Sequence, residues 1–383
     1  MRPTPLIRLD SVSKRWGESV GVDAVDLEIH EGAFVVLLGP SGCGKSTTLR
    51  LIAGLETPDR GRVFIRDADV TARAPAGRGL SMVFQSYALF PHLTVRDNIT
   101  FGVRVRGLPK ATIAERLGRA VAMTGLEGLE ARKPSELSGG QRQRVALARA
   151  IVAGHPICLM DEPLSNLDAK LRHSVRQEIR ALQRNLGMTV VYVTHDQTEA
   201  MGMADRIVLM DRGRIAQAGT PEDLYLAPAS MFVAGFIGSP PMNMIGAVHV
   251  PPALRFGILE RDFGGDWVIG VRPENLEITA GGDDGLPVRI RDVEYLGAET
   301  LVYAESAAGP LIARSPGPLP PLSGGGASAR WAGTAQHVFD STTGRRLEPA
   351  PAIRSSRGTV PIPPADQPRD AAGHRWCNAH GGL

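Results

Sequence analysis

The chain has 383 residues, 43% of them hydrophobic and 22% charged, as is usual for a soluble globular protein of two domains or of one large domain with an appendage. Its net charge of +3 gives no electrostatic reason to expect a nucleic acid as a partner. Its 3 scattered cysteines argue against a disulfide framework or a zinc site, and no apolar stretch is long enough to span a bilayer.

The first informative elements are a buried strand and a glycine-rich loop. Residues 33–38 form a short apolar run bounded by Gly32 and Gly39, which is typical of a strand in a parallel sheet. The loop after it matches G-x-x-x-x-G-K-[ST], a pattern whose backbone N–H groups wrap a triphosphate. A helix expected to begin near Gly44 would point the positive end of its dipole at the same anion. The loop consists of Gly39, Pro40, Ser41, Gly42, Cys43, Gly44, Lys45, Ser46 and Thr47.

Two side chains of this phosphate loop have specific chemistry. Lys45 would reach the β- and γ-phosphates, and Ser46 would bind Mg²⁺ through its hydroxyl. Cys43 is interpreted as a small filler in a loop whose backbone does the binding. The loop therefore predicts a site for ATP or GTP.

A second glycine-containing turn follows later in the chain. It consists of Leu137, Ser138, Gly139, Gly140 and Gln141. Ser138 is expected to N-cap a helix that runs through residues 142–151. The two glycines expose backbone N–H groups at that helix start, which predicts a second anion site, separate from the first.

An apolar strand at residues 157–160 ends in two carboxylates. Such a strand places Asp161 beside the phosphate loop, where it can hold the Mg²⁺ shell. Glu162 follows directly, and a carboxylate at that place can polarise an attacking water. A pair of acidic residues alone is commonly a solvated loop, but the apolar strand and the upstream phosphate loop favour catalysis.

An amphipathic helix is predicted after this pair. Asp168 is its expected N-cap and Gly187 its expected C-terminal stop. A further buried strand is predicted at residues 189–194, and residues 206–218 look like a hairpin that turns at residues 211–213. The apolar positions at helical spacing are Leu171, Val175, Ile179, Leu182 and Leu186.

After about Ser239 the chain changes character. Paired prolines exclude long helices, and a small all-β domain of about 100 residues is expected. Strand patterns are weak over residues 305–335, and the Pro- and Gly-rich residues 314–327 are expected to form a long loop. Residues 349–383 are expected to be a disordered tail on composition. The expected strands lie at residues 267–271, 288–295, 300–304 and 337–339.

Together these motifs resemble the ATP-binding cassette (ABC) family over residues 1–235. That family has a phosphate loop, an LSGGQ signature, an acidic strand end, a D-loop and a switch histidine, in this order. The D-loop matches residues 165–168, and the switch histidine matches His195 after a strand. A Q-loop glutamine matches Gln85, and an aromatic that stacks on adenine matches Trp16.

The resemblance implies ATP and Mg²⁺ as ligands and a role for each matched residue. Glu162 is implied as the general base, while His195 contacts the γ-phosphate and helps to position the water. Gln85 touches Mg²⁺ and the water, and it couples the site to membrane subunits. Asp168 crosses the interface to a second copy of the chain, whose signature residues Ser138, Gly139, Gly140 and Gln141 close over the phosphate.

Within the family the chain is similar to importer subunits that serve maltose, other oligosaccharides and sn-glycerol 3-phosphate. Residues 87–92 resemble the stretch that receives the coupling helix of the membrane subunits, and residues 236–243 resemble the domain junction. Residues 270–274 and 293–299 resemble a C-terminal TOBE domain. Residues 337–347 look like the end of the glycerol-3-phosphate type in particular.

The implied fold class is α/β, a P-loop NTPase ABC cassette with a helical subdomain, followed by a small all-β, TOBE- or OB-like domain. We expect the cassette at residues 1–238, its helical subdomain at about 87–153, and the β domain at 239–348. The implied partners are a second copy, two transmembrane permease subunits that dock near Gln85 to His92, and indirectly a periplasmic or lipid-anchored solute-binding protein. The implied location is the cytoplasmic face of the inner membrane.

Two other functions remain open at this point. One is an ATPase subunit of a maltose or oligosaccharide importer, because an ATPase subunit does not touch the cargo. The other is a soluble ABC ATPase without membrane partners, which would usually have two cassettes or a long coiled coil between the motifs. Only one phosphate loop and one signature occur here, so an importer of sn-glycerol 3-phosphate or a related sugar is the favoured hypothesis.

Overall fold

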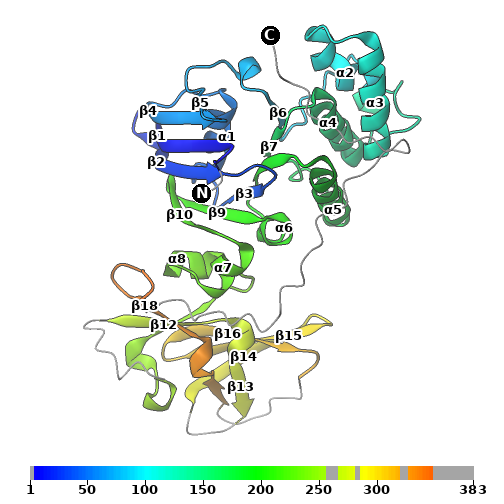
Figure 1. Cartoon of the computed structure of the whole chain (residues 1–383). Coiled ribbons are helices and arrows are strands. Elements are labelled where there is room, and N and C mark those ends of the chain that lie inside the picture. The colour runs from blue at the N-terminus through cyan, green and yellow to red at the C-terminus, as the bar shows by residue number, and fades with distance from the viewer. Residues whose placement is uncertain (1–3, 256–265, 281–284, 320–326, 348–383) are drawn as a thin grey trace. The chain divides into compact units, whose positions relative to one another are not determined.

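The computed structural model describes residues 4–255, 266–280, 285–319 and 327–347 (Figure 1). The expected tail at residues 349–383 and residues 320–326 of the expected loop lie outside these ranges. The expectation that the loop begins at residue 314 is wrong, because residues 314–316 belong to a strand, β16 (Gly309–Pro316). Within them, every helix is too short or too polar to traverse a bilayer.

A six-stranded sheet forms the centre of the N-terminal part of the chain. Its strand order is β10-β9-β3-β8-β7-β6, and every neighbouring pair is parallel except β10 with β9. The strands and hairpin predicted at residues 33–38, 157–160, 189–194 and 206–218 are confirmed within it. The strands are β3 (Phe34–Leu38), β6 (Leu80–Val83), β7 (Ile157–Asp161), β8 (Thr189–Val193), β9 (Arg206–Asp211) and β10 (Arg214–Gly219).

The central strands are apolar along their whole length because both faces of the sheet are covered. In β3, Val36 and Leu38 pack in a core shared with residues of α5 and α6, while Val35 and Leu37 pack on the opposite face with residues of α1. This alternation follows from the period of two residues in a strand. The helices are α1 (Lys45–Ala53), α5 (Ala169–Leu186) and α6 (Gln197–Met203).

A four-stranded antiparallel sheet covers the α1 face, where it shares the same core (Figure 1). Its order is β2-β1-β4-β5. The strands are β1 (Ile7–Trp16), β2 (Ser19–Ile29), β4 (Arg60–Ile65) and β5 (Ala68–Asp69).

Three helices form a separate bundle around an apolar cluster of their own (Figure 1). They are α2 (Val95–Val105), α3 (Lys110–Thr124) and α4 (Gly139–Ala153). The predicted N-cap of α4 is confirmed: the hydroxyl of Ser138 accepts a hydrogen bond from the backbone N–H of Gln141 at 3.3 Å. The helix starts at Gly139, so both glycines of the signature lie in its first turn.

The long amphipathic helix α5 also has the predicted ends. The carboxylate of Asp168 accepts a hydrogen bond from the N–H of Leu171 at 2.9 Å, and Gly187 ends the helix at a φ of 61°. Val175, Ile179 and Leu182 are buried, as their spacing predicts. Two short helices follow the central sheet, α7 (Pro221–Leu226) and α8 (Met231–Phe236).

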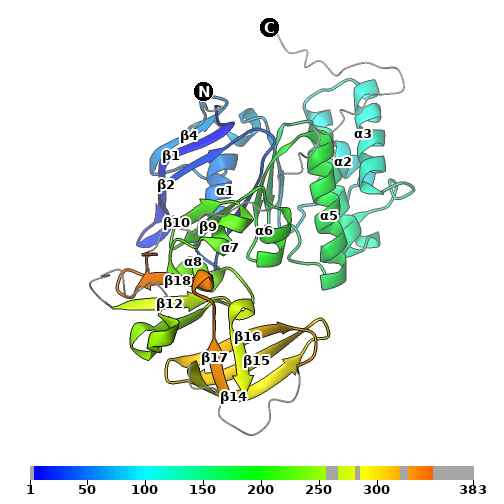
Figure 2. The ribbon, with the colours of Figure 1, turned by 60° about the horizontal axis from the view of Figure 1, so that its bottom comes forward.

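The strands after residue 239 form two antiparallel sheets (Figure 2). Their inner faces share one apolar core. The first sheet has the order β11-β12-β18 and the second β13-β17-β14-β15-β16. The strands are β11 (Asn243–Gly246), β12 (Trp267–Val271), β13 (Glu277–Ala280), β14 (Leu286–Tyr295), β15 (Glu299–Ser306), β16 (Gly309–Pro316), β17 (Ala327–Arg330) and β18 (Gln336–Asp340).

The expectation of weak strands over residues 305–335 is wrong. Strand β16 pairs with β15 over its whole length, and β17 lies between β13 and β14. In β16 the alternating residues Leu311 and Ala313 are buried. The small residues of β17 have little β propensity, but their burial between two neighbouring strands outweighs it.

Short 3-10 helices connect several of these elements. They are η1 (Pro75–Gly77), η2 (Pro134–Glu136), η3 (Ala247–His249), η4 (Pro252–Leu254), η5 (Pro273–Asn275) and η6 (Gly333–Ala335).

Candidate active site

The phosphate loop connects the end of β3 to the start of α1, as its pattern predicts. Gly39 has a φ of 147°, and a Cβ built there would lie 2.4 Å from the carbonyl oxygen of Met210. Gly44 has a φ of 106°, and its Cβ would lie 2.4 Å from the carbonyl oxygen of Gly21. Both positions therefore require glycine, because the loop packs closely against β2 and β9.

Lys45 lies buried over this loop. Its ammonium donates hydrogen bonds to the carbonyl oxygens of Gly39 at 2.9 Å and of Pro40 at 2.8 Å. Its positive charge is thus held at the concave side of the loop, near the first turn of α1. Cys43 is also buried, and burial raises the pKa of its thiol.

Ser46 and Asp161 meet although they come from different elements. The hydroxyl of Ser46 donates to Oδ1 of Asp161 at 2.8 Å. Asp161 is the last residue of β7 and is 6% exposed. A hydroxyl and a carboxylate are hard oxygen donors that fit Mg²⁺, which proteins commonly bind through one or two carboxylates together with substrate phosphates.

Glu162 and His195 form the second close pair. Nδ1 of His195 lies 3.3 Å from Oε2 of Glu162. Glu162 has a φ of 42°, the left-handed region that a non-glycine residue rarely adopts, and its backbone N–H donates to the carbonyl oxygen of Val193 at 3.1 Å. Backbone strain of this kind at a residue between β7 and the D-loop is typical of functional sites.

Gln85 lies beside the D-loop. Its side-chain amide donates to the hydroxyl of Ser165 at 3.4 Å, and its backbone carbonyl oxygen accepts from the side-chain amide of Asn166 at 3.1 Å. The hydrogen bonds described for Gln85 therefore join it to residues 165 and 166 and do not include Ser46 or Asp161.

The signature turn is held by reciprocal hydrogen bonds. The Gln141 side chain accepts from the backbone N–H of Ser138 at 2.9 Å, which completes a capping box. A Cβ on Gly140 would lie 2.7 Å from a methyl carbon of Leu171, so the turn packs against α5. Ser138 itself is exposed at the surface.

Trp16 ends β1 with 46% of its surface exposed. Its ring covers Gly21, where a Cβ would lie 2.4 Å from a ring carbon and 3.2 Å from a methyl carbon of Thr47. An exposed aromatic ring therefore lies near Thr47, the last residue of the phosphate loop, together with the ammonium of Lys14 at 5.9 Å from the ring centre.

One group of residues near the site was missed by sequence reasoning. Glu199 is buried in α6 and accepts hydrogen bonds from Tyr192 and Thr194 of the preceding strand and loop. Burial raises the pKa of this carboxyl. The available signal was its position, four residues after the switch histidine and on the first turn of a helix.

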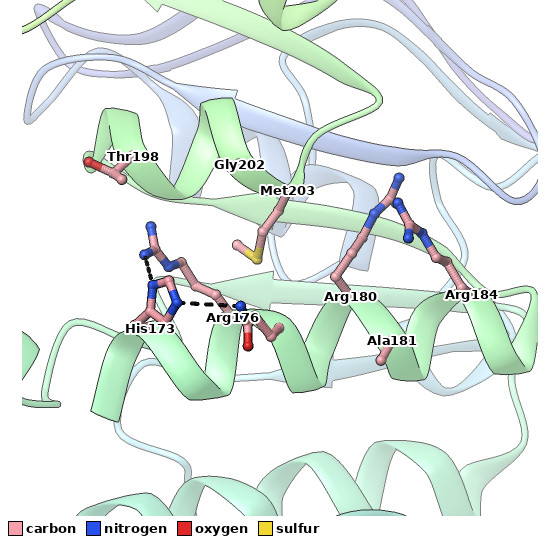
Figure 3. A pocket seen from close by; sticks show the side chains of 9 residues that line it. His173, Arg176, Arg180, Ala181, Arg184, Thr198, Gly202 and Met203 are labelled. Atoms are coloured by element: carbon pink, nitrogen blue, oxygen red, sulfur yellow. Dashed lines mark hydrogen bonds between the residues drawn. The ribbon is translucent and has the colours of Figure 1, made fainter. Parts of the chain in front are cut away.

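Two surface grooves lie apart from Glu199 and its hydrogen-bond partners. The first, of about 460 Å³, is lined by residues near Gln85, by η2, by α4 and by the D-loop: Ser86, Tyr87, Leu89, Pro134, Gly139, Arg142 and Asn166. The second, of about 440 Å³, lies between α5 and α6 and contains Arg176, Arg180 and Arg184 but no predicted site residue (Figure 3). Met203 separates Arg176 from the other two arginines in this view.

Comparison with known proteins gives matches over almost the whole described chain. The sequence profile of the ABC transporter family matches residues 22–165, and that of the TOBE domain matches residues 269–339. The sn-glycerol-3-phosphate import ATP-binding protein UgpC of Cereibacter sphaeroides is 46% identical over 346 residues, covering 89% of this chain and 99% of the relative. UgpC of Brucella abortus is 51% identical over 318 residues, covering 81% and 90%.

A relative named for another substrate is nearly as similar. The trehalose/maltose import ATP-binding protein MalK of Thermococcus litoralis is 43% identical over 368 residues, covering 89% of this chain and 99% of the relative. Among solved structures, a dimeric bacterial ABC transporter cassette has a TM-score of 0.51 and 34% identity, covering 56% of this chain and 98% of that one. A post-hydrolysis structure of that cassette with ADP and phosphate has a TM-score of 0.51 and 33% identity, covering 56% of this chain and 98% of that one.

Proposed function

We propose that sn-glycerol 3-phosphate is the cargo served by this chain, which belongs to the family of ATP-binding subunits of ABC importers. The observation that supports this cargo is the 51% and 46% identity to two proteins named for its import. Residues 337–347, which resemble the end of that type, include residues 337–340 of strand β18. Maltose or another oligosaccharide is the second candidate, supported by the 43% identity to the trehalose/maltose protein.

The pairing of Glu162 with His195 supports hydrolysis of ATP by an activated water. Glu162 would accept a proton from the water that attacks the γ-phosphorus, and His195 would hold that water and the γ-phosphate in place. Lys45 would exchange a hydrogen bond to a loop carbonyl for one to a phosphate oxygen. These roles assign the proton transfer and the charge stabilisation to different side chains.

The Ser46–Asp161 pair is the proposed magnesium site. Ser46 would bind the ion directly, and Asp161 would hold its shell from the end of β7. The ion supplies positive charge for the β- and γ-phosphates. Gln85 would join this shell from the Q-loop, after release of its hydrogen bond to Ser165.

A second copy of the chain completes the proposed site. The phosphate loop leads into the N-terminus of α1, and the signature turn leads into the N-terminus of α4, so each can bind an anion. The signature turn also contacts α5 of its own chain. In a twofold head-to-tail dimer, Ser138, Gly139, Gly140 and Gln141 of one copy would cover the ATP held by the other, with Asp168 at the interface. Trp16 would stack on the adenine.

The groove beside the Q-loop is the proposed docking place for membrane subunits. It contains Tyr87 and Leu89 from the segment between Gln85 and His92. Phe90 from the same segment packs on Phe101 of α2 at 4.6 Å between ring centres, and 42% of Phe101 is exposed. We therefore assign the docking of two permeases to this face. A solute-binding protein would act through the permeases, and the chain would have a peripheral position at the inner membrane.

The proposed division of the chain follows these sites. Residues 1–238 would form the cassette, with its helical subdomain at about 87–153, and residues 239–348 would form the TOBE domain.

Uptake of radiolabelled sn-glycerol 3-phosphate by the source organism tests the cargo. A strain lacking the gene should lose uptake, wild-type protein should restore it, and Lys45→Ala protein should not, although it should accumulate to the same level. Loss of maltose uptake in the deletion strain, with glycerol 3-phosphate uptake unchanged, would instead establish the second candidate.

A further inference from the structure

A buried carboxylate lies directly behind the switch histidine. Glu199, on the first turn of α6, is 4% exposed. Its Oε2 accepts hydrogen bonds from the hydroxyl of Tyr192 at 2.8 Å and from that of Thr194 at 2.7 Å. Burying a carboxylate costs free energy unless the group is hydrogen-bonded, and the two hydroxyls supply such hydrogen bonds to Glu199.

The hydrogen bonds of Thr194 extend this contact into the loop of His195. The same Thr194 oxygen that donates to Glu199 accepts from the backbone N–H of Asp196 at 3.0 Å. Asp196 in turn caps α6, since its carboxylate accepts from the N–H of Thr198 at 2.7 Å and of Glu199 at 3.1 Å. The residues on both sides of His195 are therefore bound to the first turn of α6.

A small cavity connects Glu199 with the proposed catalytic pair. Its volume is about 30 Å³, which is enough for one water. Arg172, from α5, supplies a positive charge in its wall. The cavity is lined by Glu162, Ser165, Arg172, Thr194, His195, Asp196 and Glu199.

We propose that Glu199 is a positioning residue that holds His195 in reach of Glu162 and of the γ-phosphate, by fixing Thr194. The proposal rests on the role proposed above for His195. Glu199 contacts neither ATP nor the attacking water in this scheme. It keeps the hydroxyl of Thr194 turned so that the same oxygen can accept from Asp196, and this sets the course of the chain through His195.

Tyr192 and Thr194 provide a matched pair of variants. Each donates one hydroxyl to the same oxygen of Glu199, but only Thr194 is also bonded to the histidine loop. In the full-length protein, Thr194→Val should lower kcat for ATP hydrolysis at least about tenfold, since small displacements of a catalytic group have effects of this size or larger. Tyr192→Phe should leave kcat within about twofold, and KM for ATP should be unchanged within about twofold in both. Equal kcat losses in the two variants, or unchanged kcat in Thr194→Val, would overturn the proposal.

A double-mutant cycle separates positioning from a general structural role. Glu199→Ala should lower kcat, and Glu199→Gln, whose amide oxygen can still accept from Thr194, should recover most of it. In a His195→Ala background, Glu199→Ala should cause no further loss, because a residue that acts only through His195 has nothing left to position. Additive losses would refute the role of Glu199, whereas wild-type turnover in His195→Ala alone would refute the role of His195 itself.

Discussion

Ser46 donates its hydroxyl proton to Asp161 at 2.8 Å, although 115 residues separate them in the chain. The contact exists because β3 and β7 are parallel strands on either side of β8, so their carboxyl ends lie at one edge of the sheet. Ligands of open α/β sheets bind at this edge. Substitution of Ser46 therefore tests the proposed magnesium site.

Ser46→Ala should raise the Mg²⁺ concentration needed for half-maximal ATP hydrolysis at least about tenfold, because it removes the side chain proposed to bind the ion directly. Ser46→Thr keeps the hydroxyl and fits the same loop pattern, so its Mg²⁺ requirement should stay close to wild type. The measurement is ATPase rate against free Mg²⁺ at saturating ATP. An unchanged Mg²⁺ requirement in Ser46→Ala would remove Ser46 from the metal site.

Arg272, directly after β12, is hydrogen-bonded to the two helices that follow the central sheet, α7 and α8, and to the residue after α8. Its buried guanidinium donates to the carbonyl oxygens of Tyr225 at 2.8 Å, of Ala234 at 3.1 Å and of Ile237, and it lies 4.1 Å from the ring centre of Tyr225. Arg272→Ala removes these hydrogen bonds from the three carbonyl oxygens.

We expect Arg272→Ala to lower the free energy of unfolding by about 2–4 kcal/mol, as removal of a buried hydrogen-bonded partner does. Arg272→Lys should recover little, since one ammonium cannot reproduce the fork of donors. Arg289→Ala, which removes an exposed partner of Glu305, is the control and should leave the unfolding midpoint unchanged. Urea denaturation followed by circular dichroism measures all three, and a wild-type midpoint for Arg272→Ala would contradict the assignment.

The buried side chain of His337 is expected to make the protein less stable in acid. Burial, and to a lesser degree the charges of Arg346 and Arg272, lower the pKa of this imidazole from 6.5 to about 4 in the folded chain. Between these two values the unfolded chain binds a proton that the folded chain does not, so stability falls as the pH falls from about 6.5 to about 4. This difference in proton binding lowers the free energy of unfolding by about 3 kcal/mol as the pH falls from about 6.5 to about 4, and it lowers it no further below about pH 4.

His337→Gln removes the titrating group and should flatten the pH dependence of the unfolding free energy between about pH 4 and 6.5 by about 3 kcal/mol. The same substitution at the exposed His92 is the matched control for the loss of an imidazole. Chemical denaturation at a series of pH values gives the slopes. A His337→Gln slope equal to that of wild type would show that His337 takes up its proton equally in both states.

The motifs could be predicted from the sequence because each depends on local backbone chemistry. Gly39, Gly44 and Lys45 follow from the needs of a phosphate loop, and Ser138 and Asp168 cap their helices through contacts three residues away. The central strands were recognisable because both faces of the sheet are covered, which makes them continuously apolar.

Contacts that depend on packing between distant elements could not be predicted. Glu199 has the pattern of an exposed helical residue, and only the approach of α6 to β8 buries it against Tyr192. Strand β17 was missed for a similar reason, because small residues become a strand when two neighbours supply the hydrogen bonds. The hydrogen bond from Gln85 to Ser165 likewise joins two loops 80 residues apart.

Glu162→Gln should convert the chain into a dimer that stays closed on ATP. Glutamine keeps the size of Glu162 but cannot accept the proton of the attacking water, and loss of a general base costs a factor of ~10²–10⁴ in rate. Lys45, Ser46 and Ser138 are unchanged, so ATP should bind with nearly wild-type affinity. Because the nucleotide lies between the two copies in the proposed dimer, slow hydrolysis leaves the interface intact.

Light scattering of the full-length protein measures this state directly. The molar mass of Glu162→Gln should be that of a dimer in ATP and that of a monomer in ADP. The mass of the wild-type protein should return to that of a monomer as ATP is consumed. Glu222→Gln, an exposed glutamate in the first turn of α7, is the control and should behave as wild type. A Glu162→Gln protein that remains monomeric with ATP bound would contradict the shared site, and one that hydrolyses ATP at the wild-type rate would exclude Glu162 as the base.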